Sequence, residues 1–330
     1  MTDLTTRYLG LYLKNPLVAA SSGYTGSLEH LKELEKNGIG AIVLKSIFEE
    51  EIINDYHQRL NADDRFGSNI EFLDYYDYDL KEERLNDYIQ LIKDAKQELS
   101  VPIIASVNCV TSQEWTQFAV KLQDAGADAL ELNIFIMPTD TKKSGREIED
   151  EYIKIAKKIK SSITIPIAIK MSSYFSNVSE MIQKLDKTGV SGLVLFNRSY
   201  NMDFNIKKMK VTASSNVFSN PEDYTLPLRW IAVNSNNVNC SLAASTGIHN
   251  GESFVKLLLA GATVVQIAST IYLNGPEYIT SILSELEDWM REHKFLNIDQ
   301  FRGKLSRDKV KNPAEFERVQ FMKHFGNKEV

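Results

Sequence analysis

Two turns rich in small and hydroxyl-bearing residues lie close together in the last third of the chain. Ser245-Thr246-Gly247 follows the apolar run 242–244, and Ala268-Ser269-Thr270 follows the β-branched run 263–267. Such turns between a strand and a helix expose backbone amides and hydroxyls, which are groups that bind phosphate. The pair therefore predicts a phosphate site, although a tight turn alone also favours small residues.

Two lysines stand directly after apolar segments. Lys45 follows residues 40–44, and Lys170 follows residues 165–169. A charge at the end of a buried strand is costly unless it faces a cleft or solvent, so both are candidate site residues, with plain solvation as the alternative for Lys45. An ammonium at Lys170 could stabilise an anionic ring.

Amide and hydroxyl side chains stand at the other expected strand ends. These residues are Ser22, Ser46, Asn108, Asn133, Asn197, Thr246 and Ser269, with Gly23 and Gly247 beside them. Two lysines, three amides and two phosphate-type turns fit a planar, anionic ligand better than a sugar or a peptide. Flavin mononucleotide (FMN) meets that description. Asn133 could contact the flavin or a substrate, or it could be a satisfied core amide.

The segments that must position these residues alternate between strand and helix patterns. Strands are expected at 17–20, 40–44, 103–107, 129–132, 167–169, 192–195, 242–244 and 263–267. Helices are expected at 28–36, 82–98, 113–124, 146–159, 178–187, 227–233 and 252–260, with a further helix from Ile271. About eight such units predict an α/β protein with a (β/α)8 TIM barrel, in which the polar strand ends meet at one rim.

Two long polar segments, 49–80 and 197–226, interrupt this alternation. We expect long loops there, at the carboxyl face of the strands, and we expect the first of them, 49–80, to act as a lid or a binding loop. The aromatic residues of the first segment are also typical of a subunit interface. We expect a single domain, 1–330, with a barrel core of about 15–292 and a charged, helical C-terminal tail at 293–330.

Composition narrows the class of protein. A net charge of −6 gives no basic excess for nucleic acid or an anionic membrane. The chain has two cysteines, Cys109 and Cys240, and its start lacks signal-peptide character, which predicts a cytoplasmic protein. Its five histidines show no metal-ligand spacing, so no metal is expected. No apolar run approaches the ~20 residues of a membrane-spanning helix.

Several motifs, taken in order, resemble one family. They are Asn15-Pro16, Ala20-Ser21-Ser22-Gly23, Lys45-Ser46, Glu131-Leu132-Asn133, 166–170, Thr246-Gly247-Ile248 and 261–267. Together they resemble the class 1 dihydroorotate dehydrogenases from about Asn15 to the helix after Ser269. The resemblance implies a barrel that binds FMN non-covalently, a cytoplasmic homodimer, and the oxidation of dihydroorotate to orotate in pyrimidine biosynthesis.

The resemblance also implies roles for individual residues. It places the catalytic role on Lys45, Lys170 and Asn133, and it gives flavin N5 the hydride while a base removes the neighbouring proton. The substrate would contact Asn133, Thr139 and Asn197. The residues expected to bind FMN are Ser21, Ser22, Lys45, Ser46, Asn108, Asn133, Lys170, Thr246, Gly247, Ala268 and Ser269.

The chain departs from the family pattern where the substrate should bind. The family carries a catalytic Cys or Ser before Pro-Asn in the loop after Asn133, whereas this loop has Met137, Pro138 and Thr139. A thioether cannot accept the proton. Cys109 or Thr139 could be a relocated base, and an ordinary buried thiol is the alternative for Cys109.

This departure leaves two other functions open. One is an FMN oxidoreductase acting on a different cyclic or unsaturated substrate. The other is a non-catalytic relative that binds flavin or a phosphate ligand. At the phosphate turns, Thr246 and Ala268 replace family glycines, and both replacements keep the residue small.

Overall fold

The computed structural model describes residues 2–48, 70–108, 112–198, 202–213 and 217–317. Eight parallel strands form a closed barrel in which each strand pairs with the next one along the chain, and the last, β13, pairs back with β3. The barrel strands are β3 (Leu17–Ala19), β4 (Ala41–Val43), β6 (Ile103–Asn108), β7 (Ala129–Asn133), β8 (Ile167–Met171), β9 (Gly192–Leu195), β12 (Ser241–Ser245) and β13 (Val264–Ile267). The predicted (β/α)8 barrel is confirmed.

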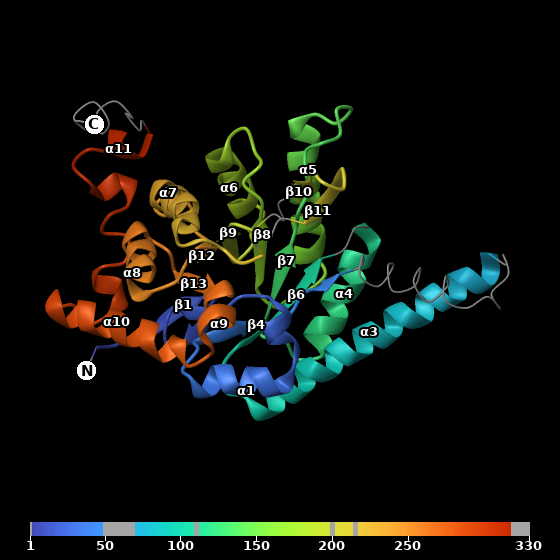
Figure 1. The fold of residues 1–330 in the computed structure, drawn as a ribbon, viewed down its shortest axis with the longest axis horizontal. Coiled ribbons are helices and arrows are strands. Elements are labelled where there is room, and N and C mark those ends of the chain that lie inside the picture. The colour runs from blue at the N-terminus through green and yellow to red at the C-terminus, as the bar shows by residue number, and fades with distance from the viewer. Residues whose placement is uncertain (1, 49–69, 109–111, 199–201, 214–216, 318–330) are drawn as a thin grey trace.

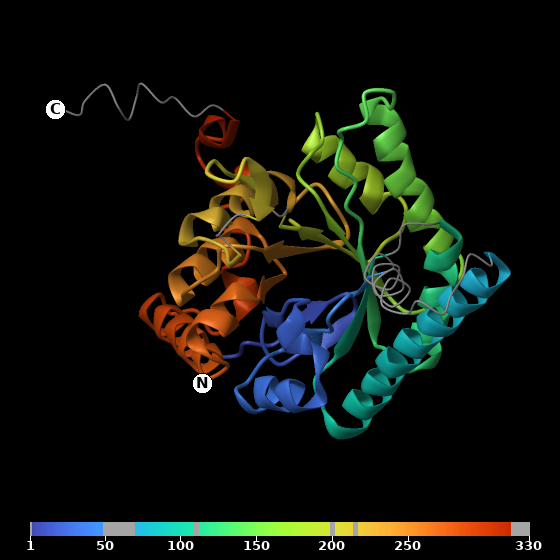
Figure 2. The same ribbon diagram turned by 45° about the vertical axis from the view of Figure 1, so that its right-hand side comes forward.

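Helices surround the strands on the outside of the barrel (Figures 1 and 2). They are α1 (Leu28–Lys36), α3 (Ile70–Glu98), α4 (Ser112–Asp124), α5 (Gly145–Lys160), α6 (Val178–Asp186), α7 (Thr225–Asn234), α8 (Gly251–Ala260), α9 (Ser269–Asn274) and α10 (Tyr278–Glu292). In α5, Ile148, Tyr152 and Ile155 are buried at helical spacing. The helix starts at a capping box, in which Glu147 N–H donates to Ser144 Oγ at 3.2 Å and Ser144 N–H donates to Glu147 Oε2 at 2.7 Å.

The barrel interior changes from apolar to polar toward the carboxyl ends of the strands. Small apolar residues such as Ala129, Ala168 and Val264 fill the amino-terminal half. Two residues further along the same three strands stand Glu131, Lys170 and Gln266, which are also buried. Side chains two positions apart share a face of a strand, so all three point into the barrel.

An N-terminal hairpin closes the opposite end of the barrel. It consists of β1 (Thr6–Tyr8) and β2 (Leu11–Leu13), which pair in antiparallel fashion. Tyr8 and Leu9 are buried against the interior residues. A Cβ at Gly192 would lie 2.5 Å from Leu9 Cδ2, so only glycine allows this close approach at the start of β9. The cavity of the barrel is therefore accessible from the carboxyl ends of the strands.

The two polar segments are more regular than their composition predicted. Residues 49–69 lie outside the described residues, but residues 70–80 belong to α3, which begins 12 residues before the predicted start at 82. No Gly or Pro interrupts residues 70–98, so nothing ends the helix. Segment 197–226 contains an antiparallel hairpin, β10 (Met202–Asn205) and β11 (Lys210–Ala213), and the short η2 (Pro221–Tyr224).

The C-terminal part has less helix than its charge pattern predicted. Within 293–317 the structure has only the short elements η3 (Ile298–Gln300), η4 (Arg307–Lys309) and α11 (Ala314–Glu317). The predicted tail beyond residue 317 lies outside the described part of the chain. No helix in the described ranges combines the length and apolar character needed to span a membrane.

Candidate functional site

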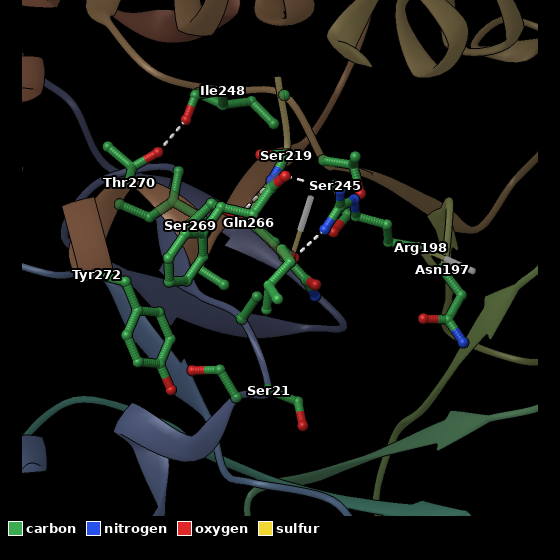
Figure 3. Close-up of a pocket in the computed structure, with 18 of the residues that line it drawn as sticks. Ser21, Asn197, Arg198, Ser219, Ser245, Ile248, Gln266, Ser269, Thr270 and Tyr272 are labelled. Carbon is green, nitrogen blue, oxygen red and sulfur yellow. Dashed lines mark hydrogen bonds between the residues drawn. The ribbon is translucent and has the colours of Figure 1, made fainter. Parts of the chain in front are cut away.

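A cavity of about 510 Å³ opens at the carboxyl ends of the barrel strands. Its wall is formed by residues at or just beyond the ends of β3, β8, β9, β12 and β13, and by segment 217–219. A volume of this size is typical of small-molecule and cofactor sites, which range from ~300 to ~1,000 Å³. Figure 3 shows Tyr272 and Arg198 on opposite sides of this cavity, with Ser219 and Ser269 between them.

The turn after β12 presents unpaired backbone amides to the cavity. Thr246 and Gly247 have φ angles of 85° and 82°, which favour glycine and cost other residues free energy. Within the described ranges, neither the Gly247 N–H nor the Ile248 N–H donates a backbone or side-chain hydrogen bond. A Cβ at Gly247 would lie 2.1 Å from Tyr224 N. This turn can therefore bind an anion, and it requires glycine at position 247.

A serine from segment 217–219 completes this end of the cavity. Ser219 N–H donates to Ser269 Oγ at 2.9 Å, and Ser219 Oγ lies 3.0 Å from His249 Nε2. Ser219 is only 8% exposed, yet it lines the cavity. Ser269, predicted to lie in a turn, begins α9 instead. Sequence analysis did not single out Ser219, because its position depends on the path of residues 217–219. His249 follows β12 and showed no metal-ligand spacing.

Arg198 holds the same segment from the other side of the cavity. Its guanidinium donates to the carbonyl oxygens of Val217 and Phe218, the latter at 2.7 Å. The Phe218 ring packs 5.4 Å from the Tyr272 ring, and Tyr272 Oη accepts the Tyr24 N–H at 2.7 Å. Arg198 therefore fixes segment 217–219, whose Phe218 ring packs on Tyr272. Sequence analysis missed it because it follows Asn197 in a segment that has no regular pattern.

A chain of serine hydroxyls connects three strand ends. Ser21 Oγ lies 2.9 Å from Ser46 Oγ, which lies 2.7 Å from Ser106 Oγ. Next to it, the Tyr88 hydroxyl accepts the Ser106 N–H at 2.9 Å and donates to the Ser106 carbonyl at 3.2 Å. The Tyr88 hydroxyl thus hydrogen-bonds the backbone of β6 between the stretch that pairs with β4 and the stretch that pairs with β5 (Ile47–Phe48). Burial raises the pKa of Tyr88, so this hydroxyl stays neutral.

The structure brings three predicted site residues together inside the rim. Lys170 Nζ lies 3.4 Å from Gln266 Oε1 and 3.7 Å from Glu131 Oε1. Asn197 Nδ2 donates to Asn133 Oδ1 at 2.7 Å. Lys170 and Asn197 line the cavity, and Asn133 lies behind Asn197. A buried ammonium and an oriented amide can together bind a planar, electron-rich ring.

The remaining predicted residues divide into two groups. The cavity is lined by Ser21, Ser22, Lys170, Asn197, Thr246, Gly247, Ala268 and Ser269, whereas Lys45, Ser46, Asn108, Asn133 and Thr139 do not line it. Lys45 and Thr139 have exposed side chains. Ser22 Oγ is buried and has no hydrogen-bond partner among the described residues. Cys109 lies outside the described residues.

The Tyr152 side chain on α5 holds the loop after β7 in place. The Tyr152 hydroxyl accepts the Ile136 N–H and donates to the Ile134 carbonyl, both at 3.2 Å. Burial raises the pKa of Tyr152, which keeps it protonated. Met137 is 40% exposed. Residues 134–138 therefore contain no side chain that accepts a proton near neutral pH, and the Thr139 hydroxyl stays a prediction as a relocated base.

Comparison with known proteins identifies the family. A family model described as "Dihydroorotate dehydrogenase" matches residues 3–290. The chain belongs to the dihydroorotate dehydrogenase family. Its family places it among the oxidoreductases. The described residues contain no group of three His, Cys, Asp or Glu side chains that could hold a metal ion.

Three relatives of known name are 22% to 26% identical to the chain. The "Dihydroorotate dehydrogenase B (NAD(+)), catalytic subunit" of Thermoplasma volcanium is 26% identical over 92% of this chain and 98% of its own length. The protein of that name from Methanocaldococcus jannaschii is 26% identical, over 91% and 97%. The chloroplastic "Dihydropyrimidine dehydrogenase (NADP(+))" of Arabidopsis thaliana is 22% identical, over 91% and 76%.

Proposed function

We propose that this chain binds FMN in the cavity and oxidises dihydroorotate to orotate, a step of pyrimidine biosynthesis. One observation carries the proposal: the wall of a single cavity contains the buried ammonium of Lys170 and the backbone amides of Gly247 and Ile248, which have no hydrogen-bond partner among the described residues. A phosphate suits the amides, and an electron-rich ring suits the ammonium. The names of the relatives support dihydroorotate as the substrate.

The residues of the cavity fit an FMN molecule. Ser22 Oγ, buried without a partner among the described residues, can hydrogen-bond a ring substituent. Lys170 would hold the negative charge of the ring, and Asn197, oriented by Asn133, would donate or accept at the ring edge. When bound, FMN would supply the hydride acceptor, N5. Lys45 and Thr139 lie outside the cavity wall. Lys45 stays a prediction as a catalytic and FMN-binding residue, and Thr139 stays a prediction as a contact of the substrate.

A second candidate function is favoured by the loop after β7. The absence of an ionisable side chain in residues 134–138 suits an oxidoreductase that works on another cyclic or unsaturated substrate. The dihydropyrimidine dehydrogenase relative makes the dihydropyrimidines the first alternative class to test. A non-catalytic flavin-binding protein is the third possibility, and it predicts that bound flavin stays oxidised with every donor.

The test is an anaerobic titration of the flavin-loaded protein. We expect dihydroorotate to bleach the flavin absorbance, and dihydrouracil to have little effect at the same concentration. The opposite order would reject dihydroorotate in favour of the second function. Flavin that bleaches with dithionite but with neither pyrimidine would contradict both. The Lys170→Met variant is the control, because we expect it to keep the fold and lose most of the rate.

We also propose a cytoplasmic homodimer that acts on a small molecule, as the family resemblance implies. The relatives named as catalytic subunits raise the alternative of a larger assembly. Light scattering on the purified chain distinguishes a dimer from a monomer that lacks its partner subunit.

A further inference from the structure

A buried carboxylate lies beneath the lysine of the cavity. Glu131 on β7 is 0% exposed and points into the barrel. Its Oε2 accepts a hydrogen bond from Gln266 Nε2 at 2.7 Å. Its Oε1 has no hydrogen-bond partner within the described part of the chain, and it lies 3.7 Å from Lys170 Nζ. An ionised carboxylate in such a place is stable only beside a positive charge.

Gln266 separates the two charges of this pair. A close ammonium–carboxylate hydrogen bond measures ~2.7–2.9 Å, so the 3.7 Å distance here is too long for one. Gln266 instead donates to the carboxylate through Nε2 and accepts from Lys170 through Oε1 at 3.4 Å. A lysine ammonium has three donors. Because Lys170 also lines the cavity, the remaining donors are available to a ligand there.

The buried surroundings of the pair contain hydroxyls but, among the described residues, no other buried charge. Burial, and then the charge of Glu131, raises the pKa of Tyr8 well above its ordinary value, so its hydroxyl below this layer is neutral. Burial also raises the pKa of Tyr88, which keeps its hydroxyl neutral. Among the buried residues that the structure describes, Glu149 is the one other charged side chain, and it lies on α5 and pairs with Lys184. The charge at the base of the cavity is therefore set by Glu131 and Lys170.

We propose that Glu131 and Gln266 are positioning residues that act through Lys170 and tune the reduction potential of the flavin. Glu131 offsets the charge of the ammonium, and Gln266 keeps the ammonium away from the carboxylate and toward the cavity. The inference rests on the proposed flavin site for its readout. The contact geometry of the three side chains does not depend on the flavin.

Glu131 weakens the positive charge that the flavin would meet, and Gln266 preserves it. Substitutions of the two residues should therefore shift the reduction potential in opposite directions. Glu131→Gln removes the offsetting charge, which leaves a more positive site that favours the electron-rich ring and raises the potential. Gln266→Met removes the spacer, which lets Lys170 approach Glu131 and lowers the potential. We expect each shift to change the ratio of oxidised to reduced flavin at least tenfold at fixed potential, or about 30 mV for a two-electron couple.

The experiment is a spectroelectrochemical titration of wild type and both variants at pH 6.5. Shifts of opposite sign support the proposal. Shifts of the same sign, or a shift smaller than threefold in either variant, overturn it, because a merely loosened site would move both variants together. In a Lys170→Met background, Glu131→Gln should retain less than half of its effect.

A second readout needs no flavin and separates this inference from the proposed function. In the flavin-free protein, Lys170→Met leaves the Glu131 carboxylate buried without its counter-charge, so thermal unfolding should begin at a lower temperature. The double variant Lys170→Met/Glu131→Gln should recover part of that loss. A double variant less stable than Lys170→Met alone would overturn the charge pairing. A wild-type protein that binds no flavin, yet shows this recovery, would reject the proposed function and keep the pair.

Discussion

Gly247→Ala is the most specific change to the turn after β12, where we propose that the phosphate binds. Gly247 has a φ angle of 82°, and an added Cβ would lie 2.1 Å from Tyr224 N and 2.6 Å from Asp223 C. A left-handed conformation costs a non-glycine residue ~1–2 kcal/mol, and overpacking against backbone costs ~1–3 kcal/mol. The strain of about 2–5 kcal/mol is relieved if the turn moves, which misaligns the Gly247 and Ile248 amides.

The strain at position 247 should weaken the binding of FMN. If the ligand holds the turn in its native shape, binding must restore the strained conformation, so the dissociation constant of FMN should rise at least ~30-fold for 2 kcal/mol. Fluorescence titration of FMN with the purified protein measures this constant. Thermal unfolding of the flavin-free protein should show a smaller effect, because the free turn can relax.

Gly189→Ala is the matched control. Gly189 has nearly the same φ angle, 84°, but a Cβ there would meet no atom within 4 Å, and it lies between α6 and β9 at the amino end of the strand. It should lose ~1–2 kcal/mol of stability and bind FMN like wild type. If Gly247→Ala also binds like wild type, the turn after β12 does not hold the phosphate.

Three further predictions concern the rest of the site and the fold. Arg198→Ala should speed FMN dissociation several-fold and increase hydrogen exchange at residues 217–219, because the guanidinium no longer holds two of their carbonyls. Met137→Cys should accelerate flavin reduction by dihydroorotate at least tenfold, measured by stopped flow, if a missing base limits the rate. Burial acts to raise the pKa of Glu35, but hydrogen bonds from Ser100 and Val101 lower it overall. Glu35→Gln should therefore lose stability at pH 7, in urea unfolding, and the deficit should shrink as the pH falls below ~4.

The fold could be predicted because each barrel strand is a short apolar run followed by a segment with helical periodicity. The inward-facing charged residues could not be predicted from the same apolar runs. Glu131 and Gln266 lie in strands buried on both faces, where the sequence carries no alternation to show which side chains point inward. Only the closed barrel brings β13 opposite β7. Lys170 and Asn197 were found because each stands at the end of its strand.

The parts that sequence reasoning missed depend on loop paths. Ser219 and Arg198 come from the segment around the β10–β11 hairpin, and their contacts are set by how that segment folds back over α9. The early start of α3 was missed because charged and aromatic residues hide its helical period. Tyr88, which lies further along α3, occupies the gap in hydrogen bonding after β4.

The most direct test of the central claim is equilibrium titration of FMN into flavin-free protein, followed by the absorbance spectrum of the complex. We predict one FMN bound per chain, with phosphate-free riboflavin binding at least tenfold more weakly, because the amides of the turn after β12 would then have no phosphate to bind. A protein that binds neither flavin would contradict the claim. Equal affinity for FMN and riboflavin would contradict the phosphate cradle.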